Sequence, residues 1–204
     1  MSMADFDYSS TLIGLFLGIG LAASAGFRVF LPLFALSLAM HFNIDDYLGM
    51  GTLSESYSWV GSTVALIILG VATLVEVFSY YIPFVDNLLD TITVPLAGIA
   101  GTILVASQLA DTPEVITWTL ALIAGGGTAA TISGATAATR AISSTTTAGT
   151  GNFLVSTVET VLSMFMGIMA FILPIIAFIL TLIILFATFL IYRRMRRKKV
   201  KNTN

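Results

Sequence analysis

The 204-residue sequence contains no cysteine and only one histidine, His41. Without cysteine there is no disulfide framework and no thiol nucleophile, and cysteine usage cannot indicate a redox compartment. A single histidine does not support a histidine-based metal site or a Ser–His–Asp triad. We therefore predict no catalytic residue, no metal site and no cofactor, and we expect that the protein is not an enzyme. A paired-acid mechanism acting on lipid is the one enzymatic alternative left open.

Charged residues are also scarce. They make up 10% of the chain, against about 25% in ordinary globular domains, while 57% of the residues are hydrophobic and the mean hydropathy is +0.97. This composition predicts an all-α fold, a polytopic bundle of transmembrane helices. Membrane lipids are then expected partners, and nucleic acid is not.

Positive charge is almost absent from the body of the chain. Seven of the nine basic residues lie in the last twelve positions, and the other two are Arg28 and Arg140. By the positive-inside rule the C-terminus is cytoplasmic. We therefore expect a single transmembrane domain over residues 1–192, in the cytoplasmic (inner) membrane of a cell, and a basic cytoplasmic tail over 193–204. The tail also suits capture of anionic lipid head groups.

The apolar runs predict about six spans, since one span needs about 20 residues. The last run is long enough for two spans with a turn near Pro174, and one long helix is the alternative. Six spans place the N-terminus on the cytoplasmic side, with inner connections at 83–87 and 143–152 and acidic outer loops at 41–58 and 111–114. The apolar runs are 12–40, 59–82, 88–109, 115–142 and 153–192.

The run 12–40 is too long for one simple span. It carries Gly14 and Gly18, a GxxxG pair that suits close helix contact, and it is interrupted near Ala25-Gly26 and again by Pro32. Either it is one straight helix, or it is two half-helices that meet at Ala25-Gly26. Only a re-entrant pair of that kind would bring Arg28 near the middle of the bilayer.

Two pairs of segments hint at internal duplication. SAGFR at 24–28 resembles TAATR at 136–140, and Gly-interrupted segments in corresponding halves are a pointer to inverted-repeat transporters. FVDNLLDTI at 84–92 also resembles FLVSTVETV at 153–161. The second pair does not fit the same inverted scheme, so the sequence leaves open whether the chain contains a weak inverted repeat or none.

The stretch 124–150 consists of Ala, Gly, Ser and Thr except at Ile132, Arg140 and Ile142. Small residues allow close helix packing in lipid, so we predict a central packing helix here that ends in a polar loop, SSTTTAGTGN, at 143–152. Its hydroxyls and Gly-rich backbone, with Arg140, suit an anion. The alternative is that these residues only cap two helices.

Three segments resemble an uncharacterised bacterial family of small membrane proteins, domain of unknown function 4126. They are AASAGFRVFLPLFALSLA at 22–39, PFVDNLLDTITVPLAGIAG at 83–101 and RAISSTTTAGTGNFLVSTVET at 140–160. The resemblance implies a multi-pass membrane fold and brings no activity with it.

Acidic residues of several spans fall on the predicted cytoplasmic side together with Arg140. An unpaired charge in the membrane is very costly, so we predict an ion pair of Arg140 with Asp90 or Glu159. Such a bridge can also be purely structural. Asp90 has a further alternative, because an acid in the first turn of a helix is stabilised by the helix dipole.

These features together favour a small transporter or a translocase of lipids or anions, acting as a homodimer on an anionic or phosphate-bearing substrate. The alternative is a non-transporting scaffold or accessory subunit whose charges only bridge helices. The candidate substrate-binding or gating residues are Arg28, Glu76, Asp86, Asn87, Asp90, Arg140, Ser144, Thr146, Asn152 and Glu159.

Overall fold

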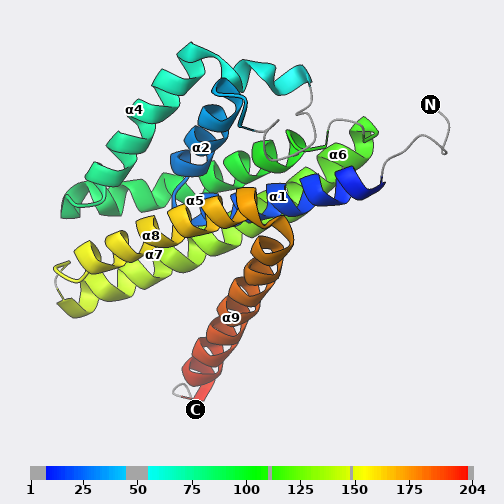
Figure 1. The fold of residues 1–204 in the computed structure, drawn as a ribbon. Coiled ribbons are helices and arrows are strands. Elements are labelled where there is room, and N and C mark those ends of the chain that lie inside the picture. The colour runs from blue at the N-terminus through cyan, green and yellow to red at the C-terminus, as the bar shows by residue number, and fades with distance from the viewer. Residues whose placement is uncertain (1–7, 45–54, 110–111, 148, 202–204) are drawn as a thin grey trace.

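The computed structural model describes residues 8–44, 55–109, 112–147 and 149–201, and over these residues the protein is helical with no strand. The predicted all-α fold is confirmed. Figure 1 shows the elements, which are α1 (Tyr8–Phe27), α2 (Phe30–His41), the 3₁₀ turn η1 (Glu55–Gly61), α4 (Thr63–Ser79), α5 (Pro83–Ala106), α6 (Glu114–Leu120), the π-helical segment η2 (Ala121–Gly126), α7 (Gly127–Thr147), α8 (Asn152–Ile172) and α9 (Pro174–Lys201).

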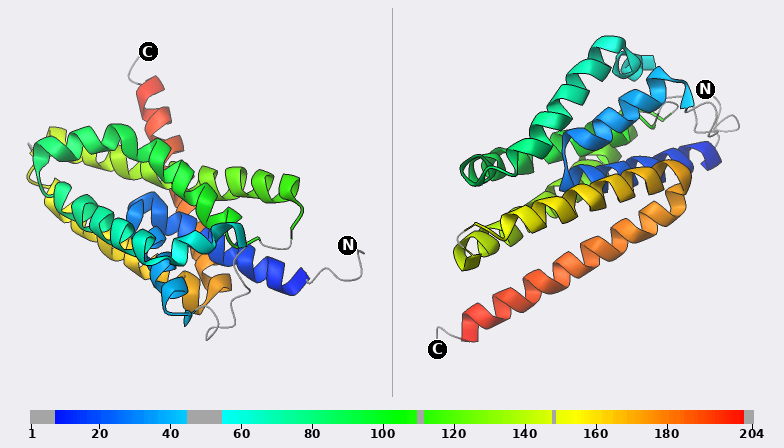
Figure 2. Two further views of the ribbon diagram at one scale, coloured as in Figure 1. Left: turned by 90° about the horizontal axis from the view of Figure 1, so that it is seen from above. Right: turned by 60° about the vertical axis from the view of Figure 1, so that its left-hand side comes forward.

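Five of the described helices are long and apolar enough to cross a membrane, and α2 and α4 are shorter apolar helices. The α4–α5 and α7–α8 connections and the end of α9 lie at one end of the bundle, which we call the tail end (Figure 2). The start of α1 and the ends of α2, α5 and α8 lie at the opposite end. The protein is thus built as a membrane-embedded bundle.

The run 12–40 forms two helices, as one of its two alternatives required. However, the break lies at Arg28-Val29 and not at Ala25-Gly26. Pro32 explains this position, because a proline has no N–H and its ring clashes with the carbonyl four residues earlier, which here belongs to Arg28. Helix α2 then returns toward the end from which α1 entered (Figure 2).

This hairpin changes the predicted topology. Because α1 and α2 enter and leave at the same end, α1 begins at the end of the bundle opposite to the end of α9 (Figure 2). The prediction that both termini lie on one side is therefore wrong. The inner connections at 83–87 and 143–152 do lie together at the tail end, as predicted.

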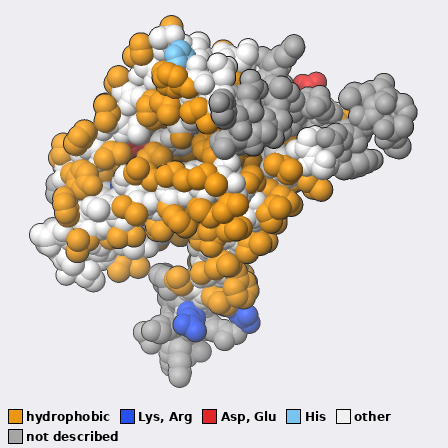
Figure 3. Space-filling view, in the orientation of Figure 1, with side chains coloured by type: hydrophobic (Ala, Val, Ile, Leu, Met, Phe, Trp, Pro, Cys, Tyr) orange, Lys and Arg blue, Asp and Glu red, His pale blue; other side chains and the backbone are white. Residues whose placement is uncertain are grey.

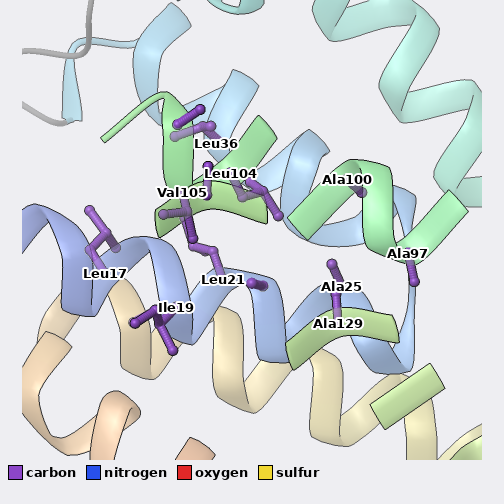
Figure 4. Close-up of a cluster of buried hydrophobic side chains, with 14 of the residues drawn as sticks. Leu17, Ile19, Leu21, Ala25, Leu36, Ala97, Ala100, Leu104, Val105 and Ala129 are labelled. Atoms are coloured by element: carbon purple, nitrogen blue, oxygen red, sulfur yellow. The ribbon is translucent and has the colours of Figure 1, made fainter. Parts of the chain in front are cut away.

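Helix α1 is the centre of the bundle. It packs against α5, α7, α8 and α9, and 61% of the most apolar part of its span is buried, compared with 33% for Glu114–Thr147, the span that contains most of the stretch 124–150. The predicted central role of 124–150 is therefore wrong, although its packing role is correct. Figure 4 shows the core, in which Leu17 and Leu21 of α1 meet Leu104 and Val105 of α5.

Glycines allow backbones to touch where the small-residue stretch meets α5. A Cβ on Gly101 would lie 2.5 Å from the carbonyl oxygen of Gly125 in η2, and a Cβ on Gly125 would overlap the carbonyl of Gly101. The Gly14–Gly18 pair of α1 does the same against the end of α5, where a Cβ on Gly14 would lie 2.5 Å from the oxygen of Gln108. Close contact through small residues is thus confirmed at both places.

The predicted polar loop at 143–152 is mostly helix, because α7 continues to Thr147. Hydroxyls of this segment donate back to carbonyls of their own helix, such as Thr146 Oγ1 to Ile142 O at 2.9 Å and Thr147 Oγ1 to Ser143 O at 2.7 Å. Serine and threonine favour such local bonds. These hydroxyls are occupied by the backbone, as the alternative reading of this stretch implied.

The run 153–192 forms α8 and α9 with the break before Pro174, so the two-span prediction is confirmed. Helix α9 carries exposed apolar side chains along its length, and Figure 3 shows basic side chains only where this helix ends. An apolar surface of this extent suits lipid and not water.

The segments of the suspected duplication point the same way. Helices α1 and α7 both run toward the tail end, and α5 and α8 both begin there (Figures 1 and 2). An inverted repeat would require opposite directions. The two matches are compatible with each other only if the repeated helices run in the same direction.

Candidate functional site

Two buried arginines lie over one tyrosine ring. The guanidinium carbons of Arg28 and Arg140 are 4.2 Å and 4.1 Å from the ring centroid of Tyr80. The relative exposure of the two arginines is 0% and 1%, and that of Tyr80 is 2%. Because a ring face attracts cations more strongly when water is excluded, Tyr80 holds together two like charges, one from the α1–α2 junction and one from α7.

Arg140 bridges two further helices. Its Nη1 lies 2.8 Å from Asp90 Oδ1 of α5, and its Nη2 lies 3.1 Å from Glu159 Oε2 of α8. The predicted ion pair therefore forms, with both candidate acids at once. The fork of the guanidinium makes this possible, since its donors point in fixed and different directions.

The three residues of this bridge share one depth. Asp90 and Glu159 each lie seven residues after the start of their helix, and Arg140 lies seven residues before the end of α7. At 1.5 Å per residue the bridge is about 10 Å inside the tail end. Asp90 is thus beyond the first turn of α5, because that helix begins at Pro83, and the helix dipole does not account for it.

Arg28 is anchored on α8. Its Nη2 donates to the carbonyl oxygen of Ser156 at 2.7 Å and lies 3.7 Å from Glu159 Oε2, and its Nε donates to Thr160 Oγ1 at 3.0 Å. Since Glu159 faces both arginines, the two ion pairs form one network. The re-entrant break therefore does bring Arg28 to the predicted acids.

Glu76 caps the start of the re-entrant half-helix. Its Oε1 accepts the backbone N–H of Val29 at 2.7 Å, and its Oε2 accepts that of Phe30 at 3.0 Å. The first N–H groups of any helix have no partner within it, and Val29 has no side chain that could serve. A carboxylate from α4 takes that place, and Glu76 is buried, with a relative exposure of 7%.

A cavity of about 530 Å³ adjoins this cap. It lies between α4 and α5, and its polar end consists of Glu76, Ser79, Tyr80 and Thr93. Its apolar wall includes Ile67, Ile68, Val71 and Val75 of α4, which are also among the exposed residues of the protein, so the cavity opens sideways toward lipid. The other lining residues are Val29, Phe30, Ala72, Leu89, Ile92 and Leu96.

The predicted residues near the α7–α8 connection make contacts within it. Asn152 is buried and donates from Nδ2 to Ser144 Oγ at 2.7 Å, while Thr146 is exposed. The bond between Asn152 and Ser144 joins the start of α8 to the end of α7 and so fixes the connection. Asp86 and Asn87 belong to the start of α5, but their side chains lie outside those that the structure describes.

Sequence reasoning did not select Tyr80, Ser156 or Thr160 as candidate site residues. Tyr80 is four residues after Glu76, and Ser156 and Thr160 flank Glu159 at −3 and +1. Residues three and four apart share a helix face. The spacing of Tyr80 and Ser156 from a buried acid was therefore the available signal.

Chemically, the network places two cations and three acids, Glu76 included, inside an apolar bundle, beside a cavity with one polar end. Such an arrangement can bind an anionic group, exchange ion-pair partners or hold a proton on an acid. Among the described residues no group of three or more His, Asp or Glu side chains could hold a metal ion.

Comparison with known proteins gives a family and no activity. No curated protein matches the sequence, and no solved structure matches the fold. A family model described as Domain of unknown function (DUF4126) matches residues 15–194. The chain therefore belongs to this family, whose function is unknown.

Proposed function

We propose that the protein is a small membrane transporter that moves anionic amphiphiles, molecules with an anionic head group and an apolar chain. The observation that carries the proposal is the cavity between α4 and α5, which is apolar along its wall and ends at Glu76 and Tyr80, beside the paired arginines. Its volume of about 530 Å³ lies in the range of small-molecule sites, roughly 300–1,000 Å³.

In this proposal the network of Arg28, Arg140, Asp90 and Glu159 is the gate. Arg140 can release Asp90 or Glu159 in exchange for a substrate anion, because guanidinium groups bind carboxylate and phosphate in the same geometry. Asp90 is the partner that is easier to release, since its side chain is 17% exposed and that of Glu159 only 4%.

The proposal extends to orientation and assembly. The tail end faces the cytoplasm, because the basic residues at the end of α9 follow the positive-inside rule. The protein acts in a cell membrane and as a homodimer. Both statements remain predictions.

A specific observation favours the alternative, a scaffold or accessory subunit. Neither Arg28 nor Arg140 lines the cavity, and both are almost fully buried. A bridge that only fixes helix positions would have this appearance. In a transporter the loss of the bridge changes the transport rate, whereas in a scaffold it changes only the stability of the protein.

The test is lipid exchange in phosphatidylcholine vesicles that contain the purified protein. A fluorescent phosphatidic acid is the anionic probe, and a fluorescent phosphatidylcholine with the same chains is the zwitterionic control. Quenching from outside the vesicle measures how fast each probe crosses. We expect the protein to accelerate the anionic probe selectively, and Arg140→Ala to slow it by about tenfold or more, which corresponds to about 1.4 kcal/mol in the barrier.

Folding of the variant must be checked by its thermal unfolding in detergent. Unchanged exchange in folded Arg140→Ala protein would refute the gating role of the network. A wild-type protein that moves neither probe faster than empty vesicles would favour the scaffold.

A further inference from the structure

The carboxylate of Glu76 occupies a position that suits a ligand. It comes from α4, yet its two oxygens accept the N–H groups of Val29, the residue before α2, and of Phe30, the first residue of α2. In membrane transporters with broken helices, half-helix N-termini of this kind point at anionic substrate groups. Here a residue of the protein itself fills the place.

A second donor stands beside this half-helix. Arg28, the residue directly before Val29, has no hydrogen-bond partner for its Nη1 among the described residues, although its relative exposure is 0%. Buried polar groups are nearly always hydrogen-bonded, and each exception calls for an explanation. A ligand oxygen arriving at this junction would satisfy that donor.

The cavity supplies the approach. Val29, Phe30 and Glu76 all line it, so a molecule in the cavity lies against the residues that form this cap. Its apolar wall suits a hydrocarbon chain. The cavity between α7 and α9, by contrast, is lined by uncharged residues.

We propose that Glu76 holds the place of a substrate head group with two anionic oxygens, which binds the N–H groups of Val29 and Phe30 and the guanidinium of Arg28 once Glu76 leaves. This inference rests on the proposed function and names its substrate class. A carboxylate and a phosphodiester share the required pair of oxygens. The substrate chain lies along α4 in the cavity.

The exchange takes up one proton. A carboxylate displaced into an apolar cavity would be unpaired and very costly, so Glu76 leaves as the neutral acid. The charged and titratable groups around it are Arg28 from the α1–α2 junction, Arg140 from α7 and Tyr80 from its own helix. Asp90 and Glu159 lie behind them, paired with the arginines.

The first test removes the Glu76 carboxylate from the N–H groups of Val29 and Phe30. In Glu76→Ala the N–H groups are uncovered and space is left for a small anion, whereas Glu76→Gln removes the charge but keeps the space filled. We expect acetate and diethyl phosphate each to raise the thermal unfolding midpoint of the Ala variant in neutral detergent by a few degrees, since a ligand that binds only the folded state stabilises it. Wild type, Glu76→Gln and Glu114→Ala, a change at an exposed acid, should show no such rise. Acetamide serves as the neutral control.

The response to the two anions identifies the head group. A rise with acetate alone assigns a carboxylate head group. A rise with diethyl phosphate alone assigns a phosphodiester head group. A rise with both anions shows that either head group fits the site. No rise in a folded Ala variant, or an equal rise in the Gln variant, would overturn the inference.

A second test uses the wild-type protein, in case the Ala variant does not fold. Lysophosphatidylglycerol carries a phosphodiester with fixed charge, and lysophosphatidylcholine has the same chain without net charge. We expect the anionic lipid to bind more weakly by about tenfold for each pH unit above the titration of Glu76, because one proton enters with it. Affinity that is independent of pH between 5 and 8, or equal for the two lipids, would contradict the exchange.

These results are separable from those of the exchange assay. Anion binding to the Glu76→Ala variant without lipid exchange in vesicles would refute the transport function and support the anion site. Exchange that depends on Arg140, with no anion effect in the Ala variant, would refute the inference and keep the transporter.

Discussion

Tyr80 is the residue on which the charged network depends. Its ring faces two arginines at 4.2 Å and 4.1 Å, and its hydroxyl lies 2.7 Å from Thr93 Oγ1. Without the ring, Arg28 and Arg140 would face each other across an empty space in a low-dielectric interior, where like charges repel strongly.

We therefore predict that Tyr80→Leu destabilises the protein more than Tyr80→Phe. Loss of two desolvated cation–π contacts should cost about 2–4 kcal/mol, while loss of the hydroxyl bond should cost about 1 kcal/mol. Unfolding by denaturant in micelles measures both. The control is Tyr81→Leu, since the Tyr81 hydroxyl pairs with Thr157 at 3.3 Å and its ring packs against that of Phe153. Equal losses in the Leu and Phe variants would show that the ring does not stabilise the cations.

How much of the site could be predicted differs from residue to residue. The pairing of Arg140 with Asp90 and Glu159 follows from one rule, that a charge in lipid needs a partner, and it is confirmed. Tyr80 could not be placed, because an aromatic residue near a helix end suits both the interface and the interior. Glu76 was named as a candidate, but its backbone partners became visible only with the α1–α2 break in place.

At the scale of elements, the contact between α5 and η2 is made by backbone and not by side chains. Gly101 and Gly125 leave no room for a Cβ on either side. Lipid offers helices little hydrophobic driving force to associate, so close backbone approach is itself a source of stability.

This contact can be tested with a pair of alanine substitutions. Gly125→Ala should push η2 away from α5 and lower the thermal unfolding midpoint by several degrees, whereas Gly127→Ala, with nothing within 4 Å of its new methyl group, should raise it slightly. The expected gain at Gly127 is the helix propensity of alanine over glycine, up to about 1 kcal/mol. Thermal unfolding of the two variants in the same detergent measures the difference. If both substitutions had the same effect, close packing at Gly125 would not matter to stability.

The boundary at Pro174 was predicted, whereas the position of the α1–α2 break and the end of α7 were missed. Pro174 marks the start of α9, and Pro32 fixes the break at Arg28. The run 143–147 looked like a loop because its residues favour turns and caps in water. In the structure their hydroxyls bond to the preceding turn of α7, which extends that helix to Thr147.

At the scale of the whole molecule, the re-entrant hairpin decides the topology. Because α2 returns to the end where α1 began, the start of α1 and the end of α9 lie at opposite ends of the bundle. Counting apolar runs could not reveal this, because the length of the run 12–40 does not show where the chain turns back.

The absence of native cysteine makes this topology directly testable. Single cysteines replacing Ser9, Ser58 and Thr150 are all at exposed positions. A membrane-impermeant maleimide should label Ser9→Cys and Ser58→Cys from one side of sealed vesicles and Thr150→Cys from the other. Labelling of Ser9→Cys from the same side as Thr150→Cys would mean that α1 crosses the membrane from the tail end, which contradicts the hairpin.

The central claim is that the buried charges serve transport and do not merely hold helices together. A buried ion network can often be replaced as a whole by apolar residues without loss of stability, because no charge is then left without a partner. Replacing Arg28, Arg140 and Glu159 by methionine and Asp90 by leucine in one variant therefore separates structure from function.

The most direct measurement is the exchange rate of fluorescent phosphatidic acid in vesicles that contain this fourfold variant. We predict that the variant folds, with an unfolding midpoint within a few degrees of wild type, and that exchange falls to the rate of protein-free vesicles. A folded variant that exchanges the probe at the wild-type rate would contradict the account and leave the charges with a structural role alone.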